Sequence, residues 1–374
     1  MNMNKSLIAL AVAGVFATSA AIADVSMYGQ ANVSYDLIDN DNGRDSHGVG
    51  SNASRFGLKG SEDLGMGLSA IWQIESQIAI GSGLSRAGNS NSSIDSTSTE
   101  NPGSQTQLAF RDTFAGLKSD RMGTVRLGRF DTPYKMATRR MDPFHNTLAD
   151  NRSIMGIGHD VRASNSVGYN SLNYSGLSVA ASYFGDQGGT APGFNTPVNG
   201  TLNTQSNTNE GYSIAGMYDV GPMFATAAYQ SISNGLSYSN ISTDAWKVGL
   251  GYSINALMLN GVYEKINNRH GSGDARAWYL SGVYNLSTTD ALKLAYTDVD
   301  NSVNQASNSG AKQYSFGYDH KMSNRTTVYA LYTKLDNDQN GGYRMGWNSG
   351  STSVSNAGLG QSPSAFSAGM KHSF

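Results

Sequence analysis

The side chains that most often carry catalysis or bind metals are sparse in this sequence. It has 374 residues, no cysteine and six histidines, which excludes thiol catalysis, disulfide scaffolds, zinc knuckles and c-type haem attachment. The histidines form no HExxH motif, and His145 and His159 are the pair that comes nearest to a metal site. Asp319 precedes His320, but no serine occupies a G-x-S-x-G nucleophile elbow. We therefore expect no catalytic centre, no metal and no cofactor.

Arginines are the other residues that could do chemistry, and they are clustered. Six of them occur between residues 126 and 162, where Asp142 and Asp150 also lie. Taken alone, this pattern predicts no more than salt bridges at a surface or rim. The whole chain has 14% charged residues and a net charge of −2, against roughly 25% charged residues in an ordinary soluble domain. The charge balance does not favour a nucleic-acid partner.

The elements that must position these residues alternate with period two. From Val25 to Leu37 the odd positions are apolar or small, and the even positions are mostly polar. Successive side chains of a β-strand point to opposite faces, so this segment has one apolar and one polar face. Sixteen such segments recur, and most have ten to thirteen residues, close to the 9–11 that a tilted membrane strand needs. The others are Ser54–Asp63, Met66–Ile80, Thr106–Lys118, Met122–Asp131, Ala163–Tyr174, Leu177–Asp186, Asn209–Val220, Pro222–Ser233, Ser242–Ile254, Ala256–Asn267, Ala275–Leu286, Asp290–Asp300, Ala311–Met322, Arg325–Asp336 and Ser364–Phe374.

The connections between these segments alternate between short turns and longer polar stretches. The five long stretches are Ile38–Ala53, Gly81–Gln105, Thr132–Arg162, Gln187–Thr208 and Asn337–Pro363. Such alternation is typical of the two rims of an outer-membrane β-barrel. A spanning sheet must close on itself because lipid offers no hydrogen bonds, and sixteen strands leave an aqueous interior. The fold prediction is therefore all-β, a 16-stranded antiparallel transmembrane barrel around a water-filled channel.

The N-terminus predicts export. A short segment with Lys5 precedes the apolar run Leu7–Phe16, and Ala21-Ile22-Ala23 fits the small-x-small cleavage rule. We expect residues 1–23 to be a signal peptide, cleaved before Asp24, and residues 24–374 to be one barrel domain.

Several segments resemble the trimeric general diffusion porins of Gram-negative outer membranes, and those of beta-proteobacteria in particular. The matching stretches run through the whole mature chain in the family's order. They are Val25–Gly29, Ser54–Gly65, Phe114–Lys118, Gly123–Arg129, Asn165–Tyr169 and Gly369–Phe374. The resemblance implies a homotrimer in contact with outer-membrane lipid and lipopolysaccharide. It also implies that Phe374 is the mark recognised by the barrel-assembly machinery.

The resemblance further implies that the third long loop, Thr132–Arg162, folds into the barrel and narrows it. Arg55 and Arg129 match basic wall positions of the family, and Arg162 is a third candidate. Asp142 and Asp150 are the candidates for the acidic side on the loop. Further candidates on the loop are Arg139, Arg140 and Arg152.

The function expected from this pattern is passive diffusion of ions and small hydrophilic solutes through a charged constriction, with a mild preference for anions. A substrate-selective channel, for a sugar or an anion, is the main alternative. A barrel enzyme or an adhesin is a more distant one, because the chain shows neither a Ser–His motif nor passenger repeats.

Overall fold

The computed structural model describes residues 24–81, 110–185, 208–236, 239–268, 274–301, 307–346 and 350–374. The predicted signal peptide, residues 1–23, lies outside the described residues. So do nearly all of the predicted loops 81–105 and 187–208.

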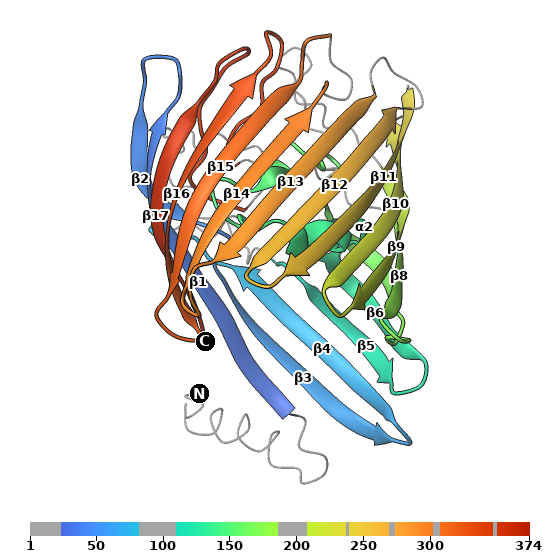
Figure 1. Cartoon of the computed structure of the whole chain (residues 1–374). Coiled ribbons are helices and arrows are strands. Elements are labelled where there is room, and N and C mark those ends of the chain that lie inside the picture. The colour runs from blue at the N-terminus through green and yellow to red at the C-terminus, as the bar shows by residue number, and fades with distance from the viewer. Residues whose placement is uncertain are drawn as a thin grey trace, which may run out of the picture.

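One closed antiparallel sheet forms the molecule (Figure 1). Its strands are β1 (Asp24–Asp39), β2 (Ser46–Ser51), β3 (Arg55–Gly65), β4 (Leu68–Gln77), β5 (Thr113–Ser119), β6 (Gly123–Asp131), β7 (Arg162–Asn170), β8 (Leu177–Phe184), β9 (Thr208–Val220), β10 (Met223–Leu236), β11 (Ser239–Ile254), β12 (Leu257–Asn268), β13 (Ala275–Asn285), β14 (Asp290–Val299), β15 (Ala311–Lys321), β16 (Thr326–Asn337) and β17 (Ser364–Ser373). When β2 and β3 are counted as one strand, each strand pairs with its neighbours in the chain.

Pairing between the first and last strands closes the sheet. β17 runs antiparallel to β1 from Gln30 opposite Ser373 to Asp39 opposite Ser364. β2 and β3 both pair with β1, so they are two parts of one barrel strand that is interrupted between Ser51 and Arg55. The barrel therefore has sixteen strands, as the period-two pattern predicted.

The two faces of the wall follow the predicted alternation. On β1, Asn32, Ser34 and Asp36 point inward and are at most 4% exposed, while Tyr35 and Leu37 point outward and are each 50% exposed. An apolar exterior around a polar interior suits a wall between lipid and water. In the part of the chain that the structure describes, no helix has the length and apolar character needed to cross a bilayer.

Some predicted boundaries were wrong. The predicted loop 38–53 contains β2, because its backbone extends the hairpin with β1 as far as Ser46. The strand predicted from Thr106 begins at Thr113, and Phe110 forms an isolated bridge with Ser76 before it. The predicted strand Ala163–Tyr174 ends at Asn170, and an isolated bridge between Tyr174 and Leu177 precedes β8.

The apolar core lies inside the barrel, between the wall and residues 132–161, which we call the inner loop. Its helix α2 (Pro133–Thr138) is visible within the barrel in Figure 1. From the inner loop, Tyr134, Met141 and Leu148 are at most 1% exposed, and they belong to one apolar cluster with Ala245 and Val262 of the wall. Burying a large apolar side chain stabilises the folded state by about 1.5–3 kcal/mol. The hydrophobic effect therefore holds this loop against the strands.

Candidate pore constriction

The inner loop starts as a capped helix. Thr132 has extended backbone angles, and its hydroxyl accepts a hydrogen bond of 3.4 Å from the Lys135 amide. Pro133 occupies the first turn of α2, where a missing N–H is tolerated. Two short 3₁₀ helices follow, η1 (Arg139–Met141) and η2 (Asn151–Ser153). The loop thus has its own local structure before it contacts the wall.

Hydrogen bonds fasten the inner loop to the strands on one side of the barrel, from β9 to β14. Side chains of the wall form hydrogen bonds with backbone groups along the length of the inner loop. The pairs are Ser213 Oγ with Tyr134 N (2.9 Å), Ser281 Oγ with Met141 O (2.8 Å), Lys293 Nζ with Pro143 O (3.2 Å) and Gln230 Nε2 with His159 O (2.7 Å). At the loop's tip, Asn32 of β1 donates to the Asn146 carbonyl at 2.8 Å. The loop therefore bridges the lumen from β9–β14 to β1.

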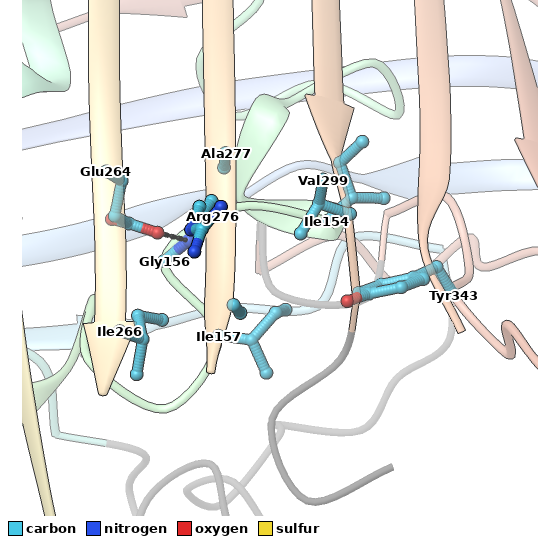
Figure 2. A pocket seen from close by; sticks show the side chains of 10 residues that line it. Ile154, Gly156, Ile157, Glu264, Ile266, Arg276, Ala277, Val299 and Tyr343 are labelled. Atoms are coloured by element: carbon cyan, nitrogen blue, oxygen red, sulfur yellow. Dashed lines mark hydrogen bonds between the residues drawn. The ribbon is translucent and has the colours of Figure 1, made fainter. Parts of the chain in front are cut away.

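Glu264 of β12 is the centre of the strongest of these attachments. Its carboxylate accepts from the Tyr134 hydroxyl at 2.7 Å and from the Gly156 amide at 2.8 Å, the bond drawn in Figure 2. Lys247 lies 4.0 Å from the same carboxylate and 2.7 Å from Asp160 of the loop. Glu264 and Lys247 are each 1% exposed. A buried charge is tolerated when it is paired and hydrogen-bonded, and here the pairing ties the loop to the wall.

Beside Glu264, an apolar pocket lies between the loop and the wall. Ile154 and Ile157 of the loop face Ile266 of β12 and Val299 of β14 across it, with Tyr343 at one side (Figure 2). This lining shows that the seam between loop and wall is apolar here.

The two predicted loop acids are buried within the inner loop. Asp142 is 6% exposed and accepts hydrogen bonds from the Tyr279 hydroxyl and from the amides of Phe144 and Asn151, at 2.8–3.0 Å. Burial and the nearby charge of Asp150 raise the pKa of Asp142 to about 6. In this position its carboxylate fixes the turn of the loop and does not face water.

Asp150 is fully buried. It accepts from the Asn146 amide at 2.7 Å, pairs with Arg152 at 2.5 Å and lies 3.3 Å from the His145 ring. Burial disfavours the charged carboxylate and by itself would raise the pKa of Asp150. Arg152 and His145 outweigh this effect of burial and hold the pKa well below its ordinary value. Arg152 is only 8% exposed, so this predicted loop arginine also serves the internal structure of the loop.

The predicted wall residue Arg55 belongs to a cluster around Glu75 of β4. Arg55 Nε lies 3.6 Å from Glu75, and Arg111 Nε lies 2.6 Å from it. The Tyr28 hydroxyl donates to the same carboxylate at 2.9 Å. The Arg55 side chain keeps 20% of its surface exposed, whereas those of Arg111 and Glu75 keep 9% each. Arg55 is therefore the member of this group that a solute in the lumen can reach best.

Arg162 forms a second cluster with acids at the ends of the neighbouring strands. Its guanidinium lies 2.5 Å from Asp112 and 3.0 Å from Asp131. Asp131 also pairs with Lys135 at 2.9 Å and with Arg139 at 3.3 Å, both from the inner loop. One nearly buried carboxylate thus holds three cations where the loop leaves the wall.

Arg139 connects the two clusters electrostatically. Burial lowers the pKa of Arg139, Asp131 opposes that change, and the charges of Arg152, Arg55 and Arg162 lower it further. Its side chain is 26% exposed, so this cation, although paired with Asp131, still reaches the lumen within range of the other arginines. The structure therefore brings Arg55, Arg162 and Arg139 together.

Of the other predicted residues, Arg129 lies beside the Arg162 cluster, whereas Arg140 and Phe374 lie elsewhere. Arg129 interacts with the charge of Arg162, and its own hydrogen bonds go to the Phe110 carbonyl (3.1 Å) and Ser164 (2.6 Å). Arg140 points away to Asp219 near the turn between β9 and β10. Phe374 joins the backbone of β1 through two hydrogen bonds with Gly29, at 3.0 and 3.1 Å.

Sequence reasoning did not single out Glu75, Arg111, Asp112, Asp131 or Lys371 for this site. A usable signal existed for Glu75 and Lys371, because a charged residue inside a spanning strand is expected to face the interior. Lys371 is exposed and interacts electrostatically with Arg55 and Arg139. Arg111 and Asp112 precede β5, where strand periodicity gives no direction.

The two loop histidines have structural partners. His159 contacts Thr243 Oγ1 at 3.1 Å, and the His145 ring accepts from Arg139 Nε at 2.7 Å. Among the described residues, no three His, Cys, Asp or Glu side chains gather closely enough to hold a metal ion.

Known proteins share this architecture. Outer membrane porin protein 32 of Delftia acidovorans is 26% identical over 387 residues and spans 100% of both chains; it is a beta-proteobacterial relative, as the resemblance predicted. The anion-selective porin from Comamonas acidovorans superposes with a TM-score of 0.69 at 22% identity, over 94% of this chain and 100% of that one. Vibrio cholerae OmpT in its trimer form superposes with a TM-score of 0.60 at 15% identity, over 94% and 99%.

A sequence model of the Gram-negative porins matches residues 9–340. The chain therefore belongs to the Gram-negative porin family, and its barrel is a channel of the Gram-negative outer membrane.

Proposed function

We propose that this porin is a general diffusion channel with a preference for small anions, set by Arg55, Arg139 and Arg162. The observation that carries the proposal is the asymmetry of charge at the inner loop. The loop acids Asp142 and Asp150 are buried and held by partners within the loop and wall, while Arg55 and Arg139 keep part of their surface exposed. A group of like charges in a narrow passage biases which ions enter.

The magnitude of this bias is set by the local dielectric. Two unit charges 4 Å apart interact by about 1 kcal/mol in bulk water and about 4 kcal/mol at an effective dielectric constant of 20. Water in a passage between protein walls lies between these limits, so one exposed arginine changes an ion's free energy by an amount that selectivity measurements detect. The Comamonas relative is itself described as anion-selective.

Reversal potentials in planar bilayers under a KCl gradient test the proposal. The wild-type channel is expected to favour chloride, and Arg55→Gln and Arg139→Gln are each expected to move the reversal potential toward that of a cation-selective pore. Arg276→Gln is the matched control, because Arg276 is exposed on the outer face of β13. A wild-type channel that strongly prefers potassium would refute the proposal. Saturation of conductance by one sugar or anion would favour a substrate-selective channel.

We further propose that the channel is non-catalytic. The most enzyme-like group in the described strands is Asp290, which accepts hydrogen bonds from Ser287 Oγ at 2.5 Å and from the His320 ring at 2.8 Å. The Ser287 hydroxyl and the His320 ring both bind the carboxylate and not each other. They therefore do not form the hydrogen-bonded nucleophile–base pair that covalent catalysis needs.

We propose a homotrimer as the working assembly, supported by the trimer form of the Vibrio relative. Three equal conductance steps per insertion are expected, and single steps throughout would contradict a trimer. We also propose that residues 1–23 are removed, since Ala21-Ile22-Ala23 fits the small-x-small cleavage rule; N-terminal sequencing of the mature protein tests this. Deleting Phe374 tests its proposed role in assembly by the fraction of folded barrel recovered from membranes.

A further inference from the structure

A small polar cavity lies inside the inner loop, between segments of the loop itself. Helix α2 lines it with Lys135 and Thr138, η1 with Arg139 and η2 with Arg152. Its volume is about 10 Å³, and a cavity of this size has room for one ligand about as large as a water molecule. Three cationic side chains thus border a space for a single small ligand.

Two carboxylates also border the cavity, but each is already engaged by other donors. Asp142 accepts hydrogen bonds of 2.8 Å from the Tyr279 hydroxyl and from the Phe144 amide. Asp160 accepts from the Lys247 ammonium at 2.7 Å. Neither acid forms a salt bridge with a cation that lines the cavity, among the ion pairs found in the described residues.

The cations of α2 and η1 are short of acidic partners. Lys135 and Arg139 both pair with Asp131, at 2.9 and 3.3 Å, and Arg162 shares the same carboxylate at 3.0 Å. In the part of the chain that the structure describes, no other carboxylate pairs with Lys135 or Arg139. One positive charge beside the cavity is therefore without an acid in contact.

Two nearly buried side chains at the cavity also have donors to spare. The Lys135 ammonium has three N–H groups, and the one acceptor that it contacts among the described residues is Asp131. The Thr138 hydroxyl donates no hydrogen bond to any described residue. Both residues are 9% exposed, so bulk water reaches these donors poorly. A ligand in the cavity can accept from both.

Repulsion between the cations favours an anion as that ligand. Burial lowers the pKa of Lys135 to about 8 although Asp131 opposes the change, and the charges of Arg162 and Arg152 lower it further. His145, which also lines the cavity, adds no charge, because burial and Arg152 lower its pKa to about 3. An anion between Lys135 and Arg152 offsets this repulsion, whereas a neutral water molecule does not.

We propose that the inner loop binds one chloride ion between Lys135, Arg139 and Arg152, with the Thr138 hydroxyl as a further donor. The Arg139 side chain is 26% exposed, so the ion can enter from the lumen. Because its ligands come from α2, η1 and η2, the bound chloride stabilises the fold of the inner loop. The site does not depend on which ions the open pore prefers, since this chloride remains bound while other ions pass.

Thermal unfolding of the folded protein in detergent tests the site. Midpoints are measured at pH 7.5 in NaCl, NaBr and sodium gluconate at equal ionic strength. A ligand that binds only the folded state raises the midpoint, so we expect higher midpoints in chloride and in bromide than in gluconate, which is too large for a cavity of about 10 Å³. The shift should reach a plateau as chloride replaces gluconate. Equal midpoints in the three salts would overturn the proposal.

Variants assign the shift to the residues. Lys135→Gln is expected to abolish the chloride-dependent shift. Thr138→Val keeps every charge and is expected to need several-fold more chloride for half of the shift, and it also serves if Lys135→Gln does not fold. Lys312→Gln, at an exposed position of β15, is expected to keep the full shift. A full shift at unchanged chloride concentration in either Lys135→Gln or Thr138→Val would contradict the site.

Bromide locates the ion directly, because it scatters X-rays anomalously. Crystals of the wild-type protein grown in NaBr are expected to show an anomalous peak in the cavity beside Lys135, and those of Lys135→Gln are expected to lack it. A cavity that holds only water would overturn the chloride site. It would leave the ion preference of the pore untouched, because reversal potentials measure that preference separately.

Discussion

The Tyr134 hydroxyl donates a 2.7 Å hydrogen bond to Glu264 Oε2, joining the first helix of the inner loop to a strand of the wall. Tyr134 is 0% exposed and Glu264 is 1% exposed. A hydrogen bond to a buried carboxylate is a strong one, and its loss leaves a charged acceptor short of a donor. The position of the loop in the lumen therefore depends on this contact.

Tyr134→Phe is expected to lower the free energy of unfolding by about 1–3 kcal/mol, the cost of leaving a buried acceptor unsatisfied. The ring stays, so apolar packing is retained. Single-channel recordings are expected to show more open-channel noise, because the loop is held less firmly. Tyr35→Phe, on the lipid-facing side of β1, is the control and should change neither quantity. A Tyr134→Phe channel with wild-type noise and stability would show that the contact does not hold the loop.

Strand order and sidedness were predictable from the sequence, because period two is a local property. Lys247 and Glu264 each stand at an inward position of a predicted strand. Their partners were not predictable, since Asp160 and Tyr134 reach them only through the tertiary path of the inner loop. Asp142 and Asp150 lie on the expected loop, but the partners that satisfy them in the interior, Tyr279 for Asp142 and Arg152 for Asp150, could not be read from the pattern.

The barrel's closure explains why the basic cluster was only partly foreseen. Arg55 and Arg162 could be identified from local motifs, whereas Lys371 comes beside Arg55 only because β17 pairs with β1. Periodicity places a residue on a face but does not say which distant strand lies next to it.

Lys371 adds positive charge to the lumen near Arg55, so Lys371→Gln is expected to reduce the preference for chloride. The change should be smaller than for Arg139→Gln, because Lys371 lies on the wall and Arg139 on the inner loop. Reversal potentials in a KCl gradient measure it. Lys312→Gln is the control, since Lys312 is exposed on the outer face of β15. An unchanged reversal potential in Lys371→Gln would remove this residue from the selectivity of the pore.

The inner loop also contains two arginines whose expected contributions to stability differ in size. Arg152→Gln is expected to cost about 3–5 kcal/mol, because it leaves the fully buried Asp150 without its main cation. Arg140→Gln is expected to cost less than about 1 kcal/mol, since its salt bridge to Asp219 is exposed on both sides. Thermal unfolding of the two variants under the same conditions tests the contrast. Similar losses for both would contradict the burial argument.

Acid is expected to weaken the inner loop through its histidines. Burial, followed by the charge of Lys247, lowers the pKa of His159 to about 3, and burial and Arg152 lower that of His145 to about 3. Their ordinary pKa is about 6.5, so the unfolded chain binds more protons than the folded one between about pH 3 and 6.5. Each histidine then makes stability rise with pH by about 1.4 kcal/mol per unit in that window.

Asp142 acts in the opposite direction. Its raised pKa of about 6 means that the folded state binds the extra proton between about pH 4 and 6, so this group alone makes stability fall as pH rises there. Between about pH 4 and 6 the two histidines outweigh this one carboxyl, and the slope from these three groups together is that of about one proton. Between pH 6 and 6.5 Asp142 no longer contributes, and the histidines alone set the slope.

His159→Gln removes one of these titrating groups and is expected to flatten the pH dependence of the unfolding midpoint between pH 4.5 and 6.5. Glutamine can still donate to Thr243, which the His159 ring contacts at 3.1 Å, so the fold should persist at pH 7.5. His47→Gln, at an exposed position of β2, should keep the wild-type slope. Midpoints measured at half-unit pH intervals decide the matter. If His159→Gln loses stability on acidification as steeply as the wild type does, the buried neutral state of His159 is not what makes the loop sensitive to acid.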